Sequence, residues 1–401
     1  MPGVLDPKST VIIDNGGSSI RCGFAGQENP SLIISNTTAR IRKSMHELVG
    51  NETVTKINDY SQLFYKRPIQ CGYVVDWETQ TKIWKKMFDE TGLNIDPHEY
   101  SLYMNDPPMN MYQLRKVGLE TIFEYFQFPA FASSPTSLWS IHRGNMLHFF
   151  PEECQATGTY LVVDSGFSFT HILPYVDHKL VTSCIRRIDI GGKVLTNYLK
   201  QLVSLRYFDL SANTMICNEM KETMCFMSKD FNKDINSNIR EHVKYYILPD
   251  YISLMKGYST SDTKVVASLA AENVQFIPLS TERFAIPELL IHPSDMGLKQ
   301  SGICETISNC ISFFPEIIQE YMSKSILFTG GNTLFPGFST RVQYLLYIYK
   351  YILYIPISDP WRGGSDLALT QTIRDQLIYN YTYEENGPDR LIDTIYENNL
   401  L

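Results

Sequence analysis

One arrangement of residues occurs twice in this chain, about 150 residues apart. Residues 10–26 (TVIIDNGGSSIRCGFAG) and 159–174 (TYLVVDSGFSFTHILP) each contain an apolar strand, an aspartate, a turn of small residues and a second apolar strand. β-Branched and aromatic residues on both sides of a Gly-rich turn are typical of a β-hairpin. The recurrence predicts an internally duplicated fold, although two unrelated hairpins would give the same pattern.

The length of the chain favours the same organisation. Its 401 residues are too many for one ordinary hydrophobic core, and they predict two lobes of about 150 to 200 residues each, with room for a cleft between them. With 44% hydrophobic and 19% charged residues, the chain can bury a large core. The net charge of −8 excludes binding of nucleic acid by the whole surface, so any contact with DNA would be local.

The spacing of the cysteines and the lack of long apolar runs indicate the kind of cellular compartment in which this protein resides. The eight cysteines form no Cys-x-x-Cys pair, which fits a reducing compartment and argues against a zinc site. No run of eighteen apolar residues occurs, and the first ten residues lack the pattern of a secretory signal. We therefore expect a protein that is neither secreted nor membrane-spanning.

Helical periodicity is clear in several segments. An amphipathic helix is expected over 76–91 with Asp76 as its N-cap, because Trp77, Ile83, Trp84, Met87 and Phe88 fall on one face. Further helices are expected over 111–127, 193–203 and 214–230.

Other segments have a weaker pattern. Residues 36–66 are polar and charged and predict a small excursion with weak structure of its own. Residues 252–275 have low charge and no repeat, which is typical of an inserted surface loop. We expect this insertion to bind a partner, with local packing on its own lobe as the alternative.

Residues 325–338 read as strand, double-glycine turn and helix start. The aromatic run 344–357 predicts a helix end and a buried strand, with an exposed partner surface as the alternative.

Both hairpin turns have the chemistry of a phosphate site. Asp14-Asn15-Gly16-Gly17-Ser18 and Asp164-Ser165-Gly166 each place a carboxylate just before glycines. Glycines allow backbone N–H groups to approach phosphate oxygens, and the carboxylate can hold Mg²⁺ through its water ligands. Asp-Asn-Gly is also an ordinary hairpin turn, so one copy alone would be weak support.

A third element makes the combination more specific. Thr329-Gly330-Gly331-Asn332-Thr333 follows an apolar strand and would bring bare backbone against an adenine or a phosphate. With the three elements in this order, the sequence resembles the actin family over nearly its whole length. The matching stretches include 10–26, RPIQCGYVVDWETQTKIW at 67–84, FPA at 128–130, VVDSGFSFTH at 162–171, RIDIGGKVLTNYL at 187–199, MKETMCFMSKDF at 220–231, FTGGNTLFPGF at 328–338 and WRGGSDLA at 361–368.

The resemblance implies an α/β actin fold, in which two duplicated ribonuclease-H-like lobes surround a nucleotide cleft. It implies ATP or ADP as the cofactor, with Mg²⁺ held through water by Asp14 and Asp164. Arg21 stands where the family has a phosphate-contacting lysine. The residues expected to bind the nucleotide are Asp14, Gly16, Gly17, Ser18, Arg21, Asp164, Gly166, Lys221, Glu222, Gly330, Gly331, Asn332, Leu334 and Phe335.

By the same resemblance each lobe has a large and a small subdomain. The expected boundaries are 1–35, 67–154 and 355–401 for the large subdomain of the first lobe, 36–66 for its small one, 155–190 and 285–354 for the large subdomain of the second lobe, and 191–284 for its small one, with the insertion near 252–275.

Departures from the family pattern concern hydrolysis. Actins use a glutamine after the Pro-Ala turn to order the attacking water, and Thr136 stands there in this chain. A shorter hydroxyl cannot reach the same water, so we expect no enzymatic activity and no catalytic residue. Phe167 replaces an acidic residue beside the nucleotide, and Ser168 and Gly17 also differ from the family. His171 is retained, but a lone histidine beside a strand is usually a buried core residue.

The stretch SSPTSLWS at 133–140 and the compact opening look most like the sixth class of nuclear actin-related proteins. That resemblance implies a structural subunit of a histone-variant-exchange chromatin-remodelling complex of the Swr type, holding ATP without efficient hydrolysis. It implies a nuclear location, with the cytoplasm as a second one, and partners that include a zinc-finger HIT-type protein, with histones reached through the complex. No membrane contact and no filaments are expected.

Two other functions stay open at this point. The first is an actin-like cytoskeletal ATPase that forms filaments. The second is a module that binds histones or nucleosomes directly, through Arg40, Arg42 and Lys43 or through the face formed by Lys82, Lys85 and Lys86, although such charges are more often solvated surface.

Overall fold

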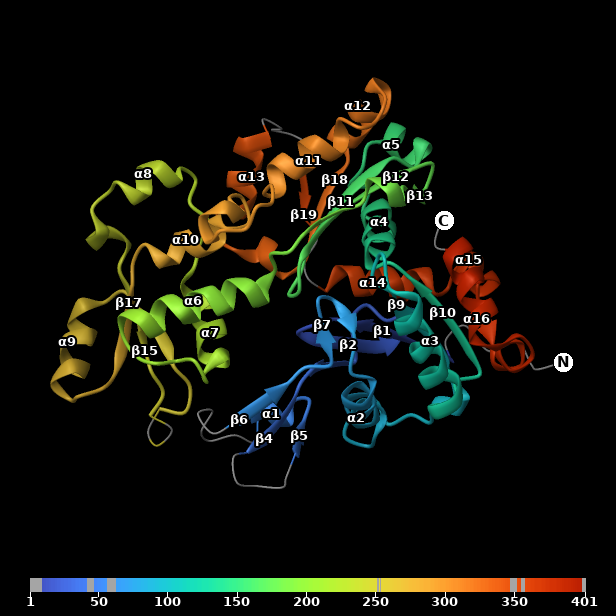
Figure 1. The fold of residues 1–401 in the computed structure, drawn as a ribbon, viewed down its shortest axis with the longest axis horizontal. Coiled ribbons are helices and arrows are strands. Elements are labelled where there is room, and N and C mark those ends of the chain that lie inside the picture. The colour runs from blue at the N-terminus through green and yellow to red at the C-terminus, as the bar shows by residue number, and fades with distance from the viewer. Residues whose placement is uncertain are drawn as a thin grey trace.

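The computed structural model describes residues 9–41, 47–55, 63–250, 252, 254–346, 352–354 and 358–398. Two lobes are visible in Figure 1, and each is built around one large sheet. The sheet of the first lobe has the order β20-β10-β9-β1-β2-β3, and that of the second has the order β13-β12-β11-β18-β19, with β14 on β12. The strands of the first sheet are β1 Thr10–Asn15, β2 Ser19–Phe24, β3 Leu32–Ser35, β9 Ser101–Asn105, β10 Ala130–Ser134 and β20 Ile378–Tyr379. Those of the second are β11 Tyr160–Ser165, β12 Thr170–Val176, β13 Lys179–Leu180, β14 Arg186–Ile188, β18 Ile326–Thr329 and β19 Ile352–Tyr354.

The two large sheets share one topology. In each, the hairpin is antiparallel, β1 with β2 and β11 with β12. The first strand of each hairpin then pairs in parallel with a later strand, β1 with β9 and β11 with β18, and a further parallel strand follows. The expected duplication and the α/β actin-type fold are therefore confirmed.

Helices cover these sheets. In the first lobe they are α2 Trp77–Phe88, α3 Tyr112–Glu120 with a π-helical turn Thr121–Tyr125, α4 Thr136–Met146, α14 Asp359–Leu367, α15 Gln371–Asp375 and α16 Asn380–Asn398. In the second they are α5 Glu152–Thr157, α11 Ile303–Ile311, α12 Glu316–Lys324 and α13 Phe338–Leu346. Short 3₁₀ turns lie at Pro97–Glu99, Thr182–Cys184, Ile239–His242, Pro293–Met296 and Gly331–Leu334.

Two smaller sheets extend the lobes. One contains β4 Thr38–Ile41, β5 Glu47–Val49 and β6 Leu63–Lys66 with the short helix α1 Glu52–Thr55, and a two-stranded ribbon of β7 Ile69–Gln70 and β8 Tyr73–Val74 follows it. The other contains β15 Lys244–Ile247, β16 Tyr258–Thr260 and β17 Phe276–Leu279. Around it lie α6 Gly192–Arg206, α7 Thr214–Met224, α8 Phe231–Ile235, α9 Thr263–Ala271 and α10 Glu282–Glu288.

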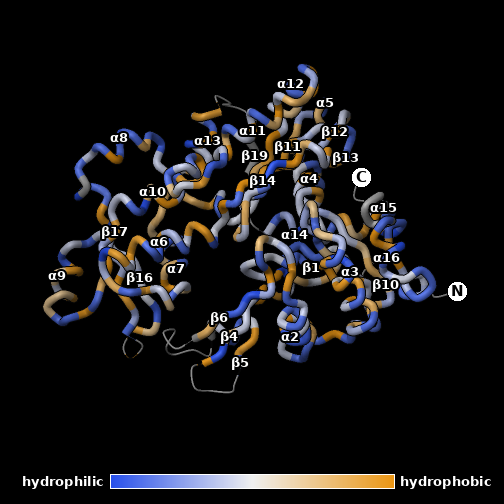
Figure 2. The backbone as a smooth tube through the Cα atoms, in the orientation of Figure 1, coloured by the Kyte–Doolittle hydropathy of each residue, from blue (hydrophilic) through white to orange (hydrophobic). Residues whose placement is uncertain are grey.

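Helix α4 connects the two lobes. Its buried Trp139 lies 5.2 Å from Tyr103 of the first sheet, measured between ring centroids, and its Ile141 belongs to the same apolar cluster as Tyr160 and Leu173 of the second sheet. Hydrophobic residues follow β11 and its neighbours in Figure 2. Because α4 packs on both sheets, its first residue stands at the junction of the lobes.

Several expected elements are confirmed. Helix α2 begins directly after Asp76, whose carboxylate accepts a hydrogen bond from the Thr79 N–H at 3.0 Å, as an N-cap should. Helices also occur within 111–127, 193–203 and 214–230, although the last ends at Met224. β18, the Gly331–Leu334 turn and α13 reproduce the pattern expected over 325–338. Within 344–357 the described residues form the end of α13 and β19, and residues 347–351 and 355–357 lie outside them.

Two expectations were wrong. Residues 36–66 have definite structure where they are described, because β4 pairs on both sides and buries Ala39, while Leu48 of β5 is buried too. The segment 252–275 is not a plain surface loop: β16 pairs with β15, and α9 buries Val266. In both cases the cross-strand ladder supplies stability that local periodicity does not reveal.

No helix in the described ranges is long and apolar enough to span a bilayer. The expected subdomain boundaries remain a prediction.

Candidate functional site

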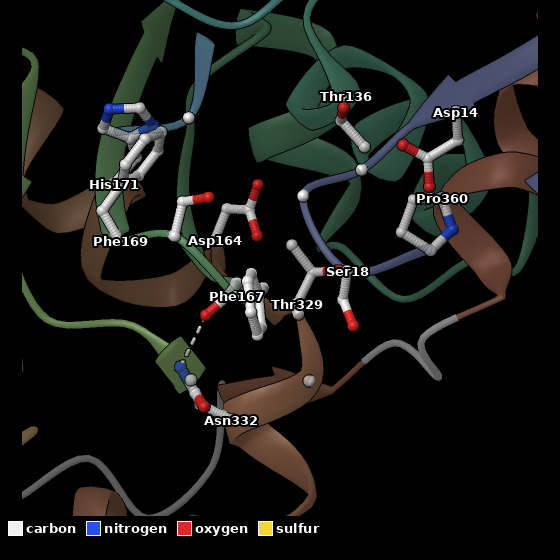
Figure 3. Close-up of a pocket in the computed structure, with 18 of the residues that line it drawn as sticks. Asp14, Ser18, Thr136, Asp164, Phe167, Phe169, His171, Thr329, Asn332 and Pro360 are labelled. Atoms are coloured by element: carbon white, nitrogen blue, oxygen red, sulfur yellow. Dashed lines mark hydrogen bonds between the residues drawn. The ribbon is translucent and has the colours of Figure 1, made fainter. Parts of the chain in front are cut away.

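A cavity of about 570 Å³ lies between the two lobes, within the size range of small-ligand pockets. The turns of both hairpins, the 330–335 segment and α7 contribute to its lining, together with the first residues of α4 (Figure 3). Every residue that was expected to bind the nucleotide lines this one cavity: Asp14, Gly16, Gly17, Ser18, Arg21, Asp164, Gly166, Lys221, Glu222, Gly330, Gly331, Asn332, Leu334 and Phe335. Their binding of a nucleotide remains a prediction.

Asp14 is the second-last residue of β1 and is held by two neighbours. The β1–β2 register puts it opposite Arg21, whose Nη1 donates to Asp14 Oδ2 at 3.2 Å. Asn105 Nδ2 donates to the other carboxylate oxygen at 3.1 Å. Burial raises the pKa of Asp14, and the Arg21 charge opposes that rise. The carboxylate therefore has a fixed orientation toward the cavity.

Asp164 occupies the equivalent place on β11, and both carboxylates face the same space in Figure 3. Burial, together with the nearby negative charge of Asp14, raises its pKa to about 6. Two carboxylates that repel one another are the donor set that a hydrated divalent cation would neutralise, so they fit Mg²⁺ held through water. Within the described ranges there is no cluster of three or more acidic, His or Cys side chains that could hold a metal directly.

The third turn is tied to the second hairpin. Gly330 has φ +96°, and a Cβ there would lie 2.2 Å from the Ser165 carbonyl oxygen, so only glycine fits this position. Asn332 is buried, and its Nδ2 donates to Ser165 Oγ at 3.1 Å and to the Gly166 carbonyl at 2.8 Å. These bonds leave backbone close to the cavity at the end where Leu334 and Phe335 form an apolar wall.

Lys221 and Glu222 differ in orientation. Lys221 is buried, and its Nζ donates to the Gly192 carbonyl, Thr196 Oγ1 and Asn218 Oδ1 at 3.2, 3.0 and 3.0 Å. Burial lowers its pKa. Glu222 is exposed and accepts from Asn218 Nδ2 at 2.8 Å. The Lys221 ammonium group thus forms its hydrogen bonds within the second lobe, and these bonds join helices α6 and α7 at the cavity rim.

Thr136 and His171 both line the cavity without forming a catalytic pair. Thr136 Oγ1 accepts a hydrogen bond from Asn105 Nδ2 at 3.2 Å. The ring of His171 lies 4.2 Å from that of Phe169, burial lowers its pKa to about 3, and its Nε2 has no hydrogen-bond partner. No contact joins the two side chains in the described structure, and His171 is a buried neutral residue.

Asn105 was missed by the sequence reasoning. It accepts from the Asn15 N–H at 2.7 Å and donates to both Asp14 and Thr136, so it links three parts of the site. A signal existed, because β9 is parallel to β1 and the carboxyl ends of parallel strands meet at one edge of a sheet. The run SLYMN at 101–105, a short apolar stretch that ends in a polar residue, was the available signal.

The turns of the two hairpins also approach one another. A Cβ placed on Gly17 would lie 2.7 Å from Ser168 Oγ and 3.3 Å from Phe167 Cδ1. Gly17, Phe167 and Ser168 are the departures noted in the sequence, and here they face each other across the cleft.

Comparison with known proteins agrees with this geometry. Residues 5–394 match the protein family described as Actin. The chain is 32% identical to Actin-related protein 6 of Oryza sativa, over 95% of this chain and 97% of that protein. It is also 32% identical to Actin-related protein 6 of Arabidopsis thaliana, over 95% and 97%. Its identity to Actin-related protein 6 of Drosophila melanogaster is 29%, over 94% and 98%.

Proposed function

The chain belongs to the actin family, a nucleotide-binding fold, and we propose that it serves as a structural, nucleotide-holding subunit of a nuclear chromatin-remodelling complex that exchanges histone variants. The observation that carries the nucleotide part is the meeting of three Gly-rich turns and two buried carboxylates around one cavity between the lobes. The role in the complex rests on the resemblance to the sixth actin-related class and on the relatives that share this class name.

The cleft would hold ATP or ADP along its length. Phe335 and Leu334 offer the adenine an apolar wall, while Gly17 offers a backbone N–H group to phosphates. The N–H groups of Gly16 and Gly166 donate within their own turns, to the carbonyl oxygens of Asp14 and Phe169 at 3.1 and 3.0 Å. Arg21 would contribute positive charge near the phosphates. A bound Mg²⁺ would neutralise phosphate and carboxylate charge between Asp14 and Asp164.

The same geometry argues against hydrolysis. Asn105 donates to Thr136 Oγ1, and this hydroxyl is too short to replace a glutamine amide that orders water. Loss of that positioning lowers the rate by roughly two orders of magnitude or more. A ligand that contacts both lobes and binds only the folded chain stabilises it by mass action, so the nucleotide acts as a structural cofactor.

Two other functions are less well supported. Direct binding of nucleosomes by Lys82, Lys85 and Lys86 is disfavoured, because Lys82 pairs with Glu47 and Glu78, Lys86 pairs with Glu52 and Asp89, and Lys85 lies over the Tyr125 ring. Arg40 is exposed, whereas Arg42 and Lys43 lie outside the described residues. A filament-forming ATPase is disfavoured by Thr136. We therefore propose that this chain contacts histones only through partners, among them a zinc-finger HIT-type protein, and that it acts in the nucleus, with a cytoplasmic pool as a secondary location.

Affinity purification from native cells tests this proposal. A tagged chain should recover one reproducible set of remodelling-complex subunits from nuclear extract, in near-equal molar amounts measured by quantitative mass spectrometry. Recovery of filament partners in place of this set would favour the cytoskeletal function. Recovery of free histones without other subunits would favour the direct-binding function.

A further inference from the structure

We propose that Phe167 makes the cleft select a nucleoside diphosphate over a triphosphate, by holding the two hairpin turns together where a third phosphate would have to enter. The inference rests on the nucleotide-holding function proposed above and names the ligand and the residue that selects it.

The two turns approach one another closely in the structure. Gly17 lies against both Phe167 and Ser168, since a single added carbon on Gly17 would come within 2.7 Å of Ser168 Oγ. In most Gly-rich phosphate sites the glycines leave space for the anion. Here side chains of the opposite turn also lie next to the glycine, on the side where a Gly17 Cβ would point.

Arg67 strengthens this contact from the first lobe. Its Nη1 donates to the carbonyl oxygens of Gly17 and Ser18 at 3.1 and 3.2 Å. Its guanidinium carbon also lies 4.8 Å from the centroid of the Phe167 ring, within the range of a cation–π contact. Arg67 therefore binds the first turn by hydrogen bonds and the second turn by a cation–π contact with the face of the Phe167 ring.

A second contact of the same kind lies beside the first. A Cβ on Gly72 would overlap the Phe169 ring, so the β7–β8 turn of the first lobe packs directly on that ring. The Arg187 guanidinium lies 4.4 Å from the Phe169 centroid, and its Nη1 donates to the Cys71 carbonyl at 3.5 Å. Two phenylalanines of one turn thus contact the first lobe.

A nucleotide would meet this contact with its last phosphate. The Phe335 wall and the two turns line the same cavity, so with adenine at the wall we place each added phosphate toward the turns. A terminal phosphate that accepts hydrogen bonds from both turns must separate Gly17 from Ser168 and Phe167 from Arg67. A diphosphate can remain on the near side of the contact and leave it intact. Breaking a cation–π contact of this kind corresponds to a loss of affinity on the order of tenfold.

Binding measurements on purified full-length chain test the inference. Dissociation constants would be measured by calorimetry for ADP and for the non-hydrolysable β,γ-imido analogue of ATP, on nucleotide-stripped wild type, Phe167→Ala and Phe167→Leu. Phe313→Ala is the matched control, because Phe313 is exposed and carries Arg186 at 4.9 Å from its ring, yet does not line the cleft. Circular dichroism would establish that each variant is folded.

We expect wild type and Phe313→Ala to bind ADP more tightly than the ATP analogue. In Phe167→Ala this preference should fall by on the order of tenfold, mainly through tighter binding of the triphosphate, with a smaller fall in Phe167→Leu. Equal or tighter binding of the triphosphate by wild type, or an unchanged ratio in both Phe167 variants, would overturn the inference and leave the proposed function standing. Failure of wild type to bind either nucleotide would overturn both.

Discussion

Replacing Asp164 with asparagine is expected to stabilise the nucleotide-free protein at neutral pH. In the folded chain burial and the Asp14 charge raise the Asp164 pKa from 3.8 to about 6. The folded state therefore binds the proton more tightly than the unfolded state does, and stability is fully present below about pH 4 and falls as the pH rises through 6. Asparagine keeps the shape of the side chain and removes this cost.

The magnitude follows from the size of the shift. A rise from 3.8 to about 6, at 1.36 kcal/mol per pKa unit, corresponds to about 3 kcal/mol, and solvent access to the cleft makes this an upper figure. The unfolding free energy of Asp164→Asn minus that of wild type should thus grow by up to about 3 kcal/mol between pH 4 and pH 7.5.

Urea denaturation of nucleotide-stripped protein across this pH range, followed by fluorescence, provides the assay. Asp295→Asn is a suitable control, because Asp295 is exposed and does not line the cleft. The reasoning is refuted if the difference between Asp164→Asn and wild type does not change with pH, or if it matches that of the control.

Three further results are expected. Purified protein should release phosphate from ATP no faster than buffer, and steady turnover by wild type in a phosphate-release assay would contradict this. Thr136→Gln alone should not restore full activity, because Phe167 and Ser168 also differ from the family. Gly330→Ala should lower the unfolding free energy by about 2 to 4 kcal/mol, and Gly297→Ala by only about 1 kcal/mol. Both glycines have positive φ, but only Gly330 is crowded by backbone atoms, so equal losses of unfolding free energy in the two variants would contradict this reasoning. Deletion of residues 256–273 should lower the melting temperature, because it removes the edge strand β16, and an unchanged melting curve would restore the interpretation of an independent loop.

The sequence was sufficient to predict the elements that local chemistry determines. The two hairpins, the cap of α2 by Asp76 and the glycine turn at 330–331 each depend on residues within a few positions of one another. Their assembly into one cleft followed from the family resemblance. The apolar periods of the helices and the double-glycine turn at 330–331 had direct signals in the residues themselves.

The remaining features depend on contacts between distant segments. Asn105 reaches Asp14 across 91 positions, and Arg67 reaches Gly17 across 50, so no local pattern shows either contact. β16 is a strand because it completes a sheet with β15, not because its own residues alternate. Lys221 was expected at the nucleotide by resemblance, and only the fold reveals three acceptors around its ammonium group.

Identification of the nucleotide carried by the purified protein tests the central claim most directly. The chain would be purified from its native cells without added nucleotide, denatured with acid, and the released nucleotides separated and quantified by ion-exchange chromatography. We predict close to one adenine nucleotide per chain, with ADP in excess of ATP. Absence of bound nucleotide, together with no rise in melting temperature when ADP and Mg²⁺ are added, would contradict a nucleotide-holding cleft.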